Sequence, residues 1–132
     1  MENEIKYIII FFALAFTIPF ILSYNSQTEK TIIKTSFLVG NKPGFDLNPN
    51  ELTFGRITPN SSASRAIAIT NSDDKPKKIS IKSSGEITKY IIASENNFFL
   101  NPNETKNMTF SVYSTNLTKF KKYSGKIIIL SK

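Results

Sequence analysis

Apolar and polar side chains alternate one by one along short stretches after residue 44, and this period of two constrains the fold more than any other feature. In Asn107–Tyr113 the apolar residues Met108, Phe110 and Val112 alternate with polar ones. Successive side chains of a strand point to opposite faces of a sheet, so this pattern is typical of a strand with one buried face. The sequence therefore predicts β-structure over most of the chain.

Further stretches show strand-like patterns, and most end in turn residues such as Gly, Pro, Asn and Asp. Pro49 confines its stretch to a sheet edge or a bulge, whereas the four consecutive apolar residues Ile127–Leu130 indicate a central strand or one covered on both faces. In the others the isoleucines Ile67 and Ile69, and Ile79 and Ile81, are expected to face inward. These stretches are Thr31–Val39, Phe45–Phe54, Ser64–Thr70, Lys77–Lys82, Ile87–Ile92, Phe98–Leu100 and Ser124–Ser131.

Strands at roughly ten-residue spacing, with no helical periodicity after Leu22, predict an all-β fold. The expected architecture is an antiparallel β-sandwich of about seven strands, preceded by one N-terminal hydrophobic helix. A closed barrel is the alternative.

The N-terminal part contains an uninterrupted apolar run, Tyr7–Leu22, in which Thr17 is the one polar residue. As a helix it would reach about 24 Å, slightly less than a hydrocarbon core of ~30 Å. Residues 1–22 are therefore predicted to be an N-terminal transmembrane anchor or a signal peptide, with membrane contact through residues 7–22. The acidic n-region and the lack of an A-x-A pattern before Ser23 favour the uncleaved anchor.

The rest of the chain is divided by composition into two parts. Residues 23–44 begin with a polar stretch that lacks periodicity, and they are predicted to be a tether with a possible extra strand at Thr31–Val39. Residues 45–132 are predicted to form the sandwich domain.

The side of the membrane on which the domain lies is predicted from conflicting signals. Lys30, Lys34 and Lys42 follow the apolar run and only Lys6 precedes it, which by the positive-inside rule favours the cytoplasm. Four N-x-S/T sequons, at Asn60, Asn103, Asn107 and Asn116, favour the outside and are glycosylation candidates, with plain loop asparagines as the alternative. We expect a membrane-anchored or secreted protein with an extracytoplasmic domain.

The chain contains no cysteine and no histidine. This composition removes thiolate nucleophiles, imidazole bases, disulfides and nearly all zinc sites. Asn71, Asp73 and Asp74 lack the spacing of a calcium loop and are expected to cap a turn. We expect no catalytic residues, no metal site and no cofactor, and the missing disulfides favour a prokaryotic source.

The net charge of +7 comes largely from lysines in two short stretches. Solvated turns and strand edges are one interpretation of these stretches, and a patch for an anionic partner is the other. Polar turn residues surround these lysines and they form no pattern of a stacking platform, so nucleic acid is not an expected partner. The lysines of this predicted patch are Lys75, Lys77, Lys78, Lys82, Lys119, Lys121, Lys122 and Lys126.

Phe45–Leu130 resembles the major-sperm-protein and ASH-type branch of immunoglobulin-like β-sandwiches. The resemblance rests on P-x-E-L-x-F-G at Pro49–Gly55, I-x-I-T-N at Ile67–Asn71, S-D-x-x-P at Ser72–Pro76, K-I-x-I-K at Lys78–Lys82, L-x-P-x-E-T at Leu100–Thr105 and Y-x-G-x-I-x-I at Tyr123–Ile129. Such domains bind other proteins, stack in tandem or decorate surfaces, and they carry no catalytic constellation. The apolar N-terminal run departs from the many cytosolic relatives in that branch.

These observations lead to a functional hypothesis. We expect a non-catalytic protein of the cell envelope of a prokaryote, archaea included, whose immunoglobulin-like domain mediates protein–protein interaction or surface structure. The alternative is a pilin-like or donor-strand filament subunit, in which Thr31–Val39 completes the sheet of a neighbouring copy and the protein is a homo-oligomer.

Overall fold

The computed structural model describes residues 4–13, 15, 28–46, 48, 50–116 and 118–132. It shows a helix at residues 4–13, eight strands and one short 3₁₀ helix. The strands are β1 (Glu29–Val39), β2 (Leu52–Ile57), β3 (Ser62–Thr70), β4 (Lys77–Gly85), β5 (Ile91–Ala93), β6 (Phe98–Leu100), β7 (Thr105–Tyr113) and β8 (Lys122–Ser131), and the 3₁₀ helix η1 is Glu86–Lys89.

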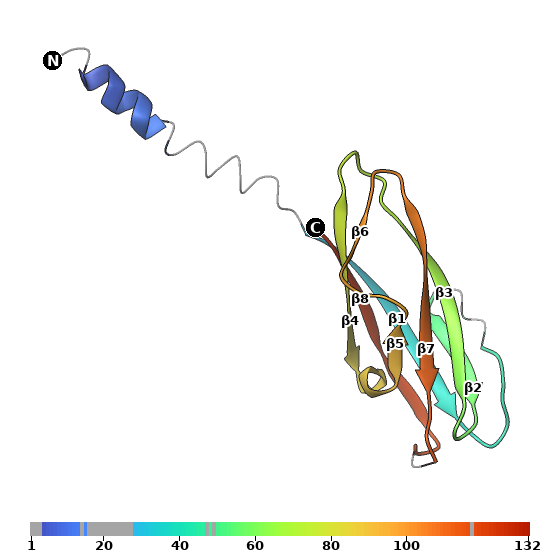
Figure 1. The fold of residues 1–132 in the computed structure, drawn as a ribbon. Coiled ribbons are helices and arrows are strands. Elements are labelled where there is room, and N and C mark those ends of the chain that lie inside the picture. The colour runs from blue at the N-terminus through green and yellow to red at the C-terminus, as the bar shows by residue number, and fades with distance from the viewer. Residues whose placement is uncertain (1–3, 14, 16–27, 47, 49, 117) are drawn as a thin grey trace.

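The strands form two sheets, which Figure 1 shows as two layers. The larger sheet has the order β2-β1-β8-β4-β6 and the smaller sheet the order β3-β7-β5. The prediction of an all-β fold with two sheets is confirmed, with eight strands in place of about seven.

One pair of neighbouring strands departs from the predicted antiparallel arrangement. β1 and β2 are parallel, with Thr35 opposite Leu52 and Val39 opposite Ile57. The chain between them first runs back beside β2, where Gly44 and Arg56 form an isolated antiparallel bridge. This return allows the next strand to run in the same direction as β1, because parallel neighbours need a long connection between them.

β1 lies inside the larger sheet, not at its edge. It pairs with β2 on one side, and on the other side ten of its residues, Glu29 to Leu38, pair with β8. The strand expected at Thr31–Val39 is therefore present, and it is two residues longer at its start. Figure 1 shows the C-terminus beside the start of β1, as expected from the pairing of Glu29 with Ser131.

The core lies between the sheets and uses the alternation found in the sequence. Met108, Phe110 and Val112 of β7 are buried, as are Ile79 and Ile81 of β4. Full burial of side chains of this size contributes about 1.5–3 kcal/mol each. The predicted inward faces of these strands are confirmed.

The N-terminal helix differs from the predicted anchor. Residues 4–13 would extend about 15 Å, roughly half of a hydrocarbon core. Within the described part of the chain, no helix is long and apolar enough to cross a membrane, so the prediction of a transmembrane helix is wrong there. Residues 1–3, 14 and 16–22 of that predicted segment, and Ser23, lie outside the described residues.

A backbone feature of β2 generates a first prediction. Gly55 has φ +72 in a bulge opposite β1, and a Cβ there would collide with the carbonyl oxygen of Gly44. We expect Gly55→Ala to lower the free energy of unfolding by about 2 kcal/mol or more, since both the left-handed backbone and the collision oppose a side chain. Urea unfolding of the full chain in mild detergent measures this. Gly44→Ala is the control, because its Cβ would meet only Arg56 Cβ at 3.6 Å; equal effects would contradict the explanation.

The amide of Asn71 generates a second prediction. Asn71 is buried, and its Nδ2 lies 2.8, 3.0 and 3.1 Å from the carbonyl oxygens of Lys75, Leu100 and Asn101. Asn71→Ala should cost about 1–3 kcal/mol by leaving these carbonyls without a donor. Asn71→Asp should be worse at neutral pH, because a carboxylate would face the same oxygens.

The pH dependence separates these two variants. Burial beside carbonyl oxygens raises the pKa of the introduced carboxyl, so its penalty is largest above that pKa and fades as the pH falls through it. Urea unfolding at several acidic pH values should therefore show that the free energy of unfolding of the Asp variant rises relative to that of the Ala variant as the pH falls. A constant difference between them would contradict this account.

Candidate functional site

The predicted lysine patch is divided by the fold. Lys78 and Lys82 of β4 and Lys122 and Lys126 of β8 alternate with core residues, so they lie on the outer face of the larger sheet. Lys75 and Lys119 lie in the connections that precede these strands. The structure thus places four of the eight lysines on one surface.

Two lysines of the predicted patch are paired with carboxylates. Lys77 Nζ lies 2.5 Å from Asp73 Oδ2 and 2.9 Å from Glu29 Oε2, and hydrogen bonds to Asp73 and Glu29 raise its pKa. Lys121 Nζ lies 2.7 Å from Glu86 Oε1, and this hydrogen bond raises the Lys121 pKa. Both ammonium charges are locally balanced.

Three further cations join the outer face from strands outside the predicted patch. Lys30 and Lys34 of β1 and Arg56 of β2 have the same orientation as the four lysines above. The register places Lys34 directly opposite Lys126, and it places Leu38 between Arg56 and Lys122. We call these seven residues the cationic face: Lys30, Lys34, Arg56, Lys78, Lys82, Lys122 and Lys126.

The larger sheet contains little negative charge to balance these cations. Glu29 is the single acidic residue in its five strands, and it is bound to Lys77. From the connection between β1 and β2, Asp46 lines a hollow with Arg56 and Lys122. Glu51 of the same connection lines a hollow with Lys34, Lys122 and Lys126. Most of the cationic face is therefore free of carboxylates from its own sheet.

An apolar patch interrupts the cations at the other end of the face. It consists of Ile32, which is 50% exposed, Phe99, which is 67% exposed, and the half-buried Ile128 and Leu130. Ile32 is opposite Ile128. Lys30 is opposite Leu130, Lys82 is opposite Ile128, and Lys78 is opposite Phe99. Each of these apolar side chains therefore has a lysine near it on its own strand or directly opposite it on a neighbouring strand.

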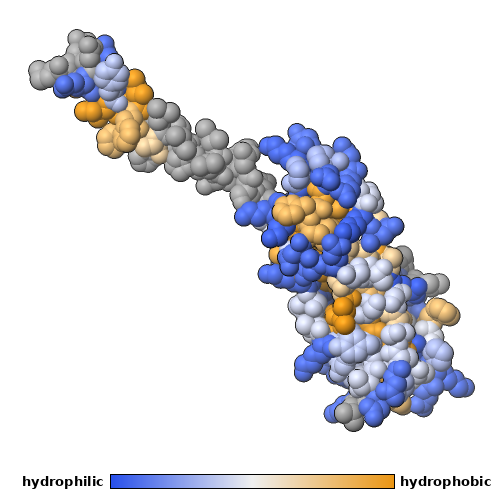
Figure 2. All heavy atoms as spheres, viewed as in Figure 1, coloured by the Kyte–Doolittle hydropathy of each residue, from blue (hydrophilic) through white to orange (hydrophobic). Residues whose placement is uncertain are grey.

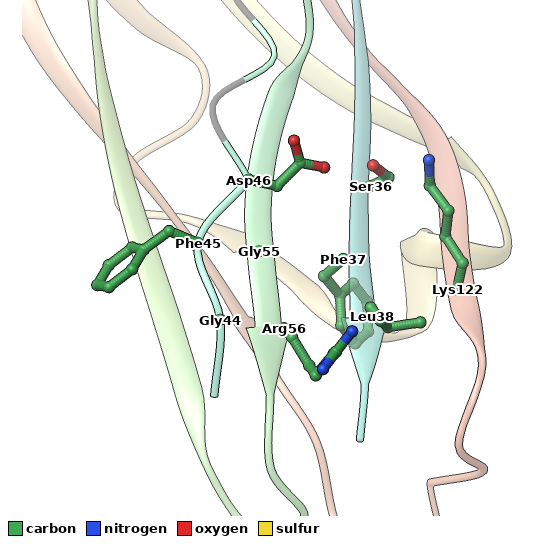
Figure 3. A pocket seen from close by; sticks show the side chains of 9 residues that line it. All are labelled: Ser36, Phe37, Leu38, Gly44, Phe45, Asp46, Gly55, Arg56 and Lys122. Carbon is green, nitrogen blue, oxygen red and sulfur yellow. The ribbon is translucent and has the colours of Figure 1, made fainter. Parts of the chain in front are cut away.

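The end of the face that carries Arg56 is hollowed. Figure 3 shows Arg56 beside Leu38, with Lys122 extending from β8 on the other side of β1. The hollow has a volume of about 330 Å³, and Ser36 and Asp46 also line it. It offers two cations and a hydroxyl to a ligand, but also one carboxylate.

The opposite outer face, on the smaller sheet, has a different character. Its outward residues on β3 and β7 carry no charge: Ser62, Ser64, Ala66, Ala68, Thr70, Thr105, Asn107, Thr109, Ser111 and Tyr113. Hydroxyl groups pair across the strands at 2.7 Å between Ser64 and Ser111 and at 2.8 Å between Thr70 and Thr105. Charge is thus concentrated on one of the two outer faces.

The four sequon asparagines are all exposed. Asn60 and Asn103 occupy turns with φ 56 and 59, Asn107 lies on the outer face of the smaller sheet, and Asn116 lies in the connection before β8. The hydroxyl of Thr118, in the Asn116 sequon, is buried and accepts a hydrogen bond from the Thr115 backbone. Glycosylation stays a prediction at all four positions.

Asn71 and Asp73, two of the residues considered for metal binding, make other contacts. Within the described ranges, no three side chains among His, Cys, Asp and Glu are grouped so that they could hold a metal ion. Asn71 Oδ1 accepts a hydrogen bond from the Asp73 backbone, which is the turn-capping arrangement expected from the sequence.

Comparisons with known proteins do not extend this description. No family model matches the chain, and no curated protein and no solved structure is significantly similar to it.

The facing lysines generate a third prediction. Lys34 and Lys126 are directly opposite each other on β1 and β8, and like charges in such a pair are destabilising. We expect Lys126→Glu to raise the free energy of unfolding by about 0.2–1 kcal/mol at low salt, and this gain should shrink with added salt. Urea unfolding of the full chain at two salt concentrations measures it.

Lys119→Glu is the matched control, because Lys119 makes the same change of charge outside the strands. Loss of stability in the Lys126 variant at low salt would contradict the interpretation, as would an equal gain in the control.

Proposed function

We propose that the protein is a non-catalytic component of the cell envelope, membrane-associated or secreted, with an extracytoplasmic domain that acts by binding an anionic partner. The cationic face is its binding surface. The domain is an immunoglobulin-like sandwich of the major-sperm-protein and ASH type.

The observation that carries this proposal is the concentration of like charge on one outer face. Lys34 faces Lys126, and the strands of the sheet place no carboxylate beside this pair; Glu51, from the connection before β2, is the acidic residue that lines the same hollow. Such an arrangement opposes folding, and local conflicts with stability are expected at functional surfaces. An anionic partner would reduce the repulsion between these like charges.

Two features support the assignment to this branch of sandwiches. Asn71, the last residue of I-x-I-T-N, reaches the carbonyl oxygens of Leu100 and Asn101 in L-x-P-x-E-T, so the two motifs are joined in space. Gly55, the last residue of the first motif, has the positive φ that favours glycine.

Exposed apolar side chains support the location at the envelope. In the helix at residues 4–13, Tyr7 is 72% exposed and Phe11 is 70% exposed. Figure 2 shows orange, hydrophobic atoms on this helix, whereas blue and white atoms cover most of the visible sandwich surface. A chain with such a segment requires an apolar environment to cover it.

The alternative function, a donor-strand filament subunit, requires β1 to pair with the sheet of a neighbouring copy. This strand is paired with β2 and β8 of its own chain. Donation to a neighbouring copy would require breaking both ladders and forming them again between copies.

Photocrosslinking in intact cells tests the binding surface. Phe99 lies beside the cationic face, and Ile92, 59% exposed on β5 of the smaller sheet, is a matched apolar control. With p-benzoylphenylalanine at either position, we expect adducts from position 99 and few from position 92. The adducts should fall severalfold when Lys78→Gln and Lys82→Gln are added, since Lys78 lies opposite Phe99 and Lys82 lies opposite Ile128 of the same apolar patch.

Equal adducts at both positions, or none at position 99, would contradict the proposed surface. Fractionation of the same cells tests the location. An intact, full-length chain in the soluble cytoplasm would contradict the envelope assignment.

A further inference from the structure

We propose that the partner of the cationic face is an anionic lipid bilayer, against which the larger sheet lies with its outer side. This inference rests on the proposed function, which makes that face the binding surface, and adds the chemistry of the partner. A protein with an acidic surface is the competing partner.

Charge complementarity is the first argument. The face presents six lysines and one arginine from four adjacent strands, β2, β1, β8 and β4. Basic residues near an anionic bilayer each gain attraction from the negative surface potential. Lysine is suited to this contact because its long apolar stem spans the interface while its ammonium group reaches the phosphates.

The apolar patch narrows the choice of anion. Ile32 and Phe99 are at least half exposed among the lysines. A polyanion without apolar surface, such as an acidic glycan, leaves these side chains in water. A bilayer supplies phosphates for the lysines and, just below them, an apolar region for Ile32 and Phe99.

The chain order favours lipid over an acidic protein. The helix at residues 4–13 exposes apolar side chains, and the chain enters the sandwich through β1. The first residues of β1 include Lys30 and Ile32, which belong to the cationic face and the apolar patch. If the N-terminal segment associates with a bilayer, this end of the sheet is held near the same surface at high effective concentration.

Fluorescence quenching in vesicles tests the contact, and the absence of cysteine allows a single label. Ser84→Cys places a fluorophore on the exposed outer side of β4, and Ala68→Cys places it on the opposite outer face, on β3. The full chain is reconstituted in phosphatidylcholine vesicles with or without phosphatidylglycerol, each containing a lipid with a quencher on its headgroup. The N-terminal segment is present in every sample, so differences between the labels report the position of the sandwich.

We expect quenching of the label at position 84 in vesicles with phosphatidylglycerol, little in phosphatidylcholine alone, and release of quenching at high salt. The label at position 68 should stay unquenched throughout. Combining Lys30→Gln, Lys82→Gln and Lys126→Gln should lower the docking constant on the order of 100-fold, from about fivefold per lysine. Lys75→Gln, Lys89→Gln and Lys119→Gln remove the same charge outside the cationic face and should have little effect.

Equal quenching at both positions, or none at position 84 with phosphatidylglycerol, would overturn the lipid proposal. Circular dichroism of each variant verifies that the strands are intact before its quenching is compared. A crosslink from position 99 to a protein in cells, together with an unquenched label at position 84, would overturn lipid as partner while leaving the proposed binding surface in place. If position 99 gave no crosslink at all, the proposal that the cationic face is the binding surface would be overturned.

Discussion

The insertion of β1 between β2 and β8 is the constraint on which the rest of the structure depends. Ten residues of β1 pair with β8, and Phe37 of the same strand stacks on Tyr123 with 5.0 Å between ring centroids. Among the strands that the structure describes, β2 pairs in the larger sheet with β1 alone, so without β1 it would have no partner there and β8 would become an edge. Unpaired strand edges are liable to pair with other chains, so this single strand also protects the sheet.

The same strand that completes the core also builds the candidate binding surface. Phe37 and Val39 of β1 are buried, while Lys30, Ile32 and Lys34 face the other way. Because side chains alternate along a strand, any shift of β1 by one residue would exchange these two sets. Core packing therefore fixes the position of the cations on the outer face, and the surface inherits the rigidity of the sheet.

The two outer faces show that the position of charge, more than its amount, distinguishes this domain. Lys77 and Lys121 are bound to nearby carboxylates. The facing pair Lys34 and Lys126 comes from β1 and β8, and these two strands together contain one acidic residue, Glu29. The net charge of +7 alone could not separate these cases. The distinction depends on which strands become neighbours, and that is a property of the sheet order.

The sequence by itself determined the β-sandwich class and the inward faces of its strands, because a period of two is local and survives in any sheet that buries one side. Ile79 and Met108 could be assigned to the core in this way. Only the tertiary structure decided that β1 is central, that β2 runs parallel to it, and that Lys30, Lys34 and Arg56 join the lysines of β4 and β8. These features depend on pairing between strands far apart in the chain, about which local alternation carries no information.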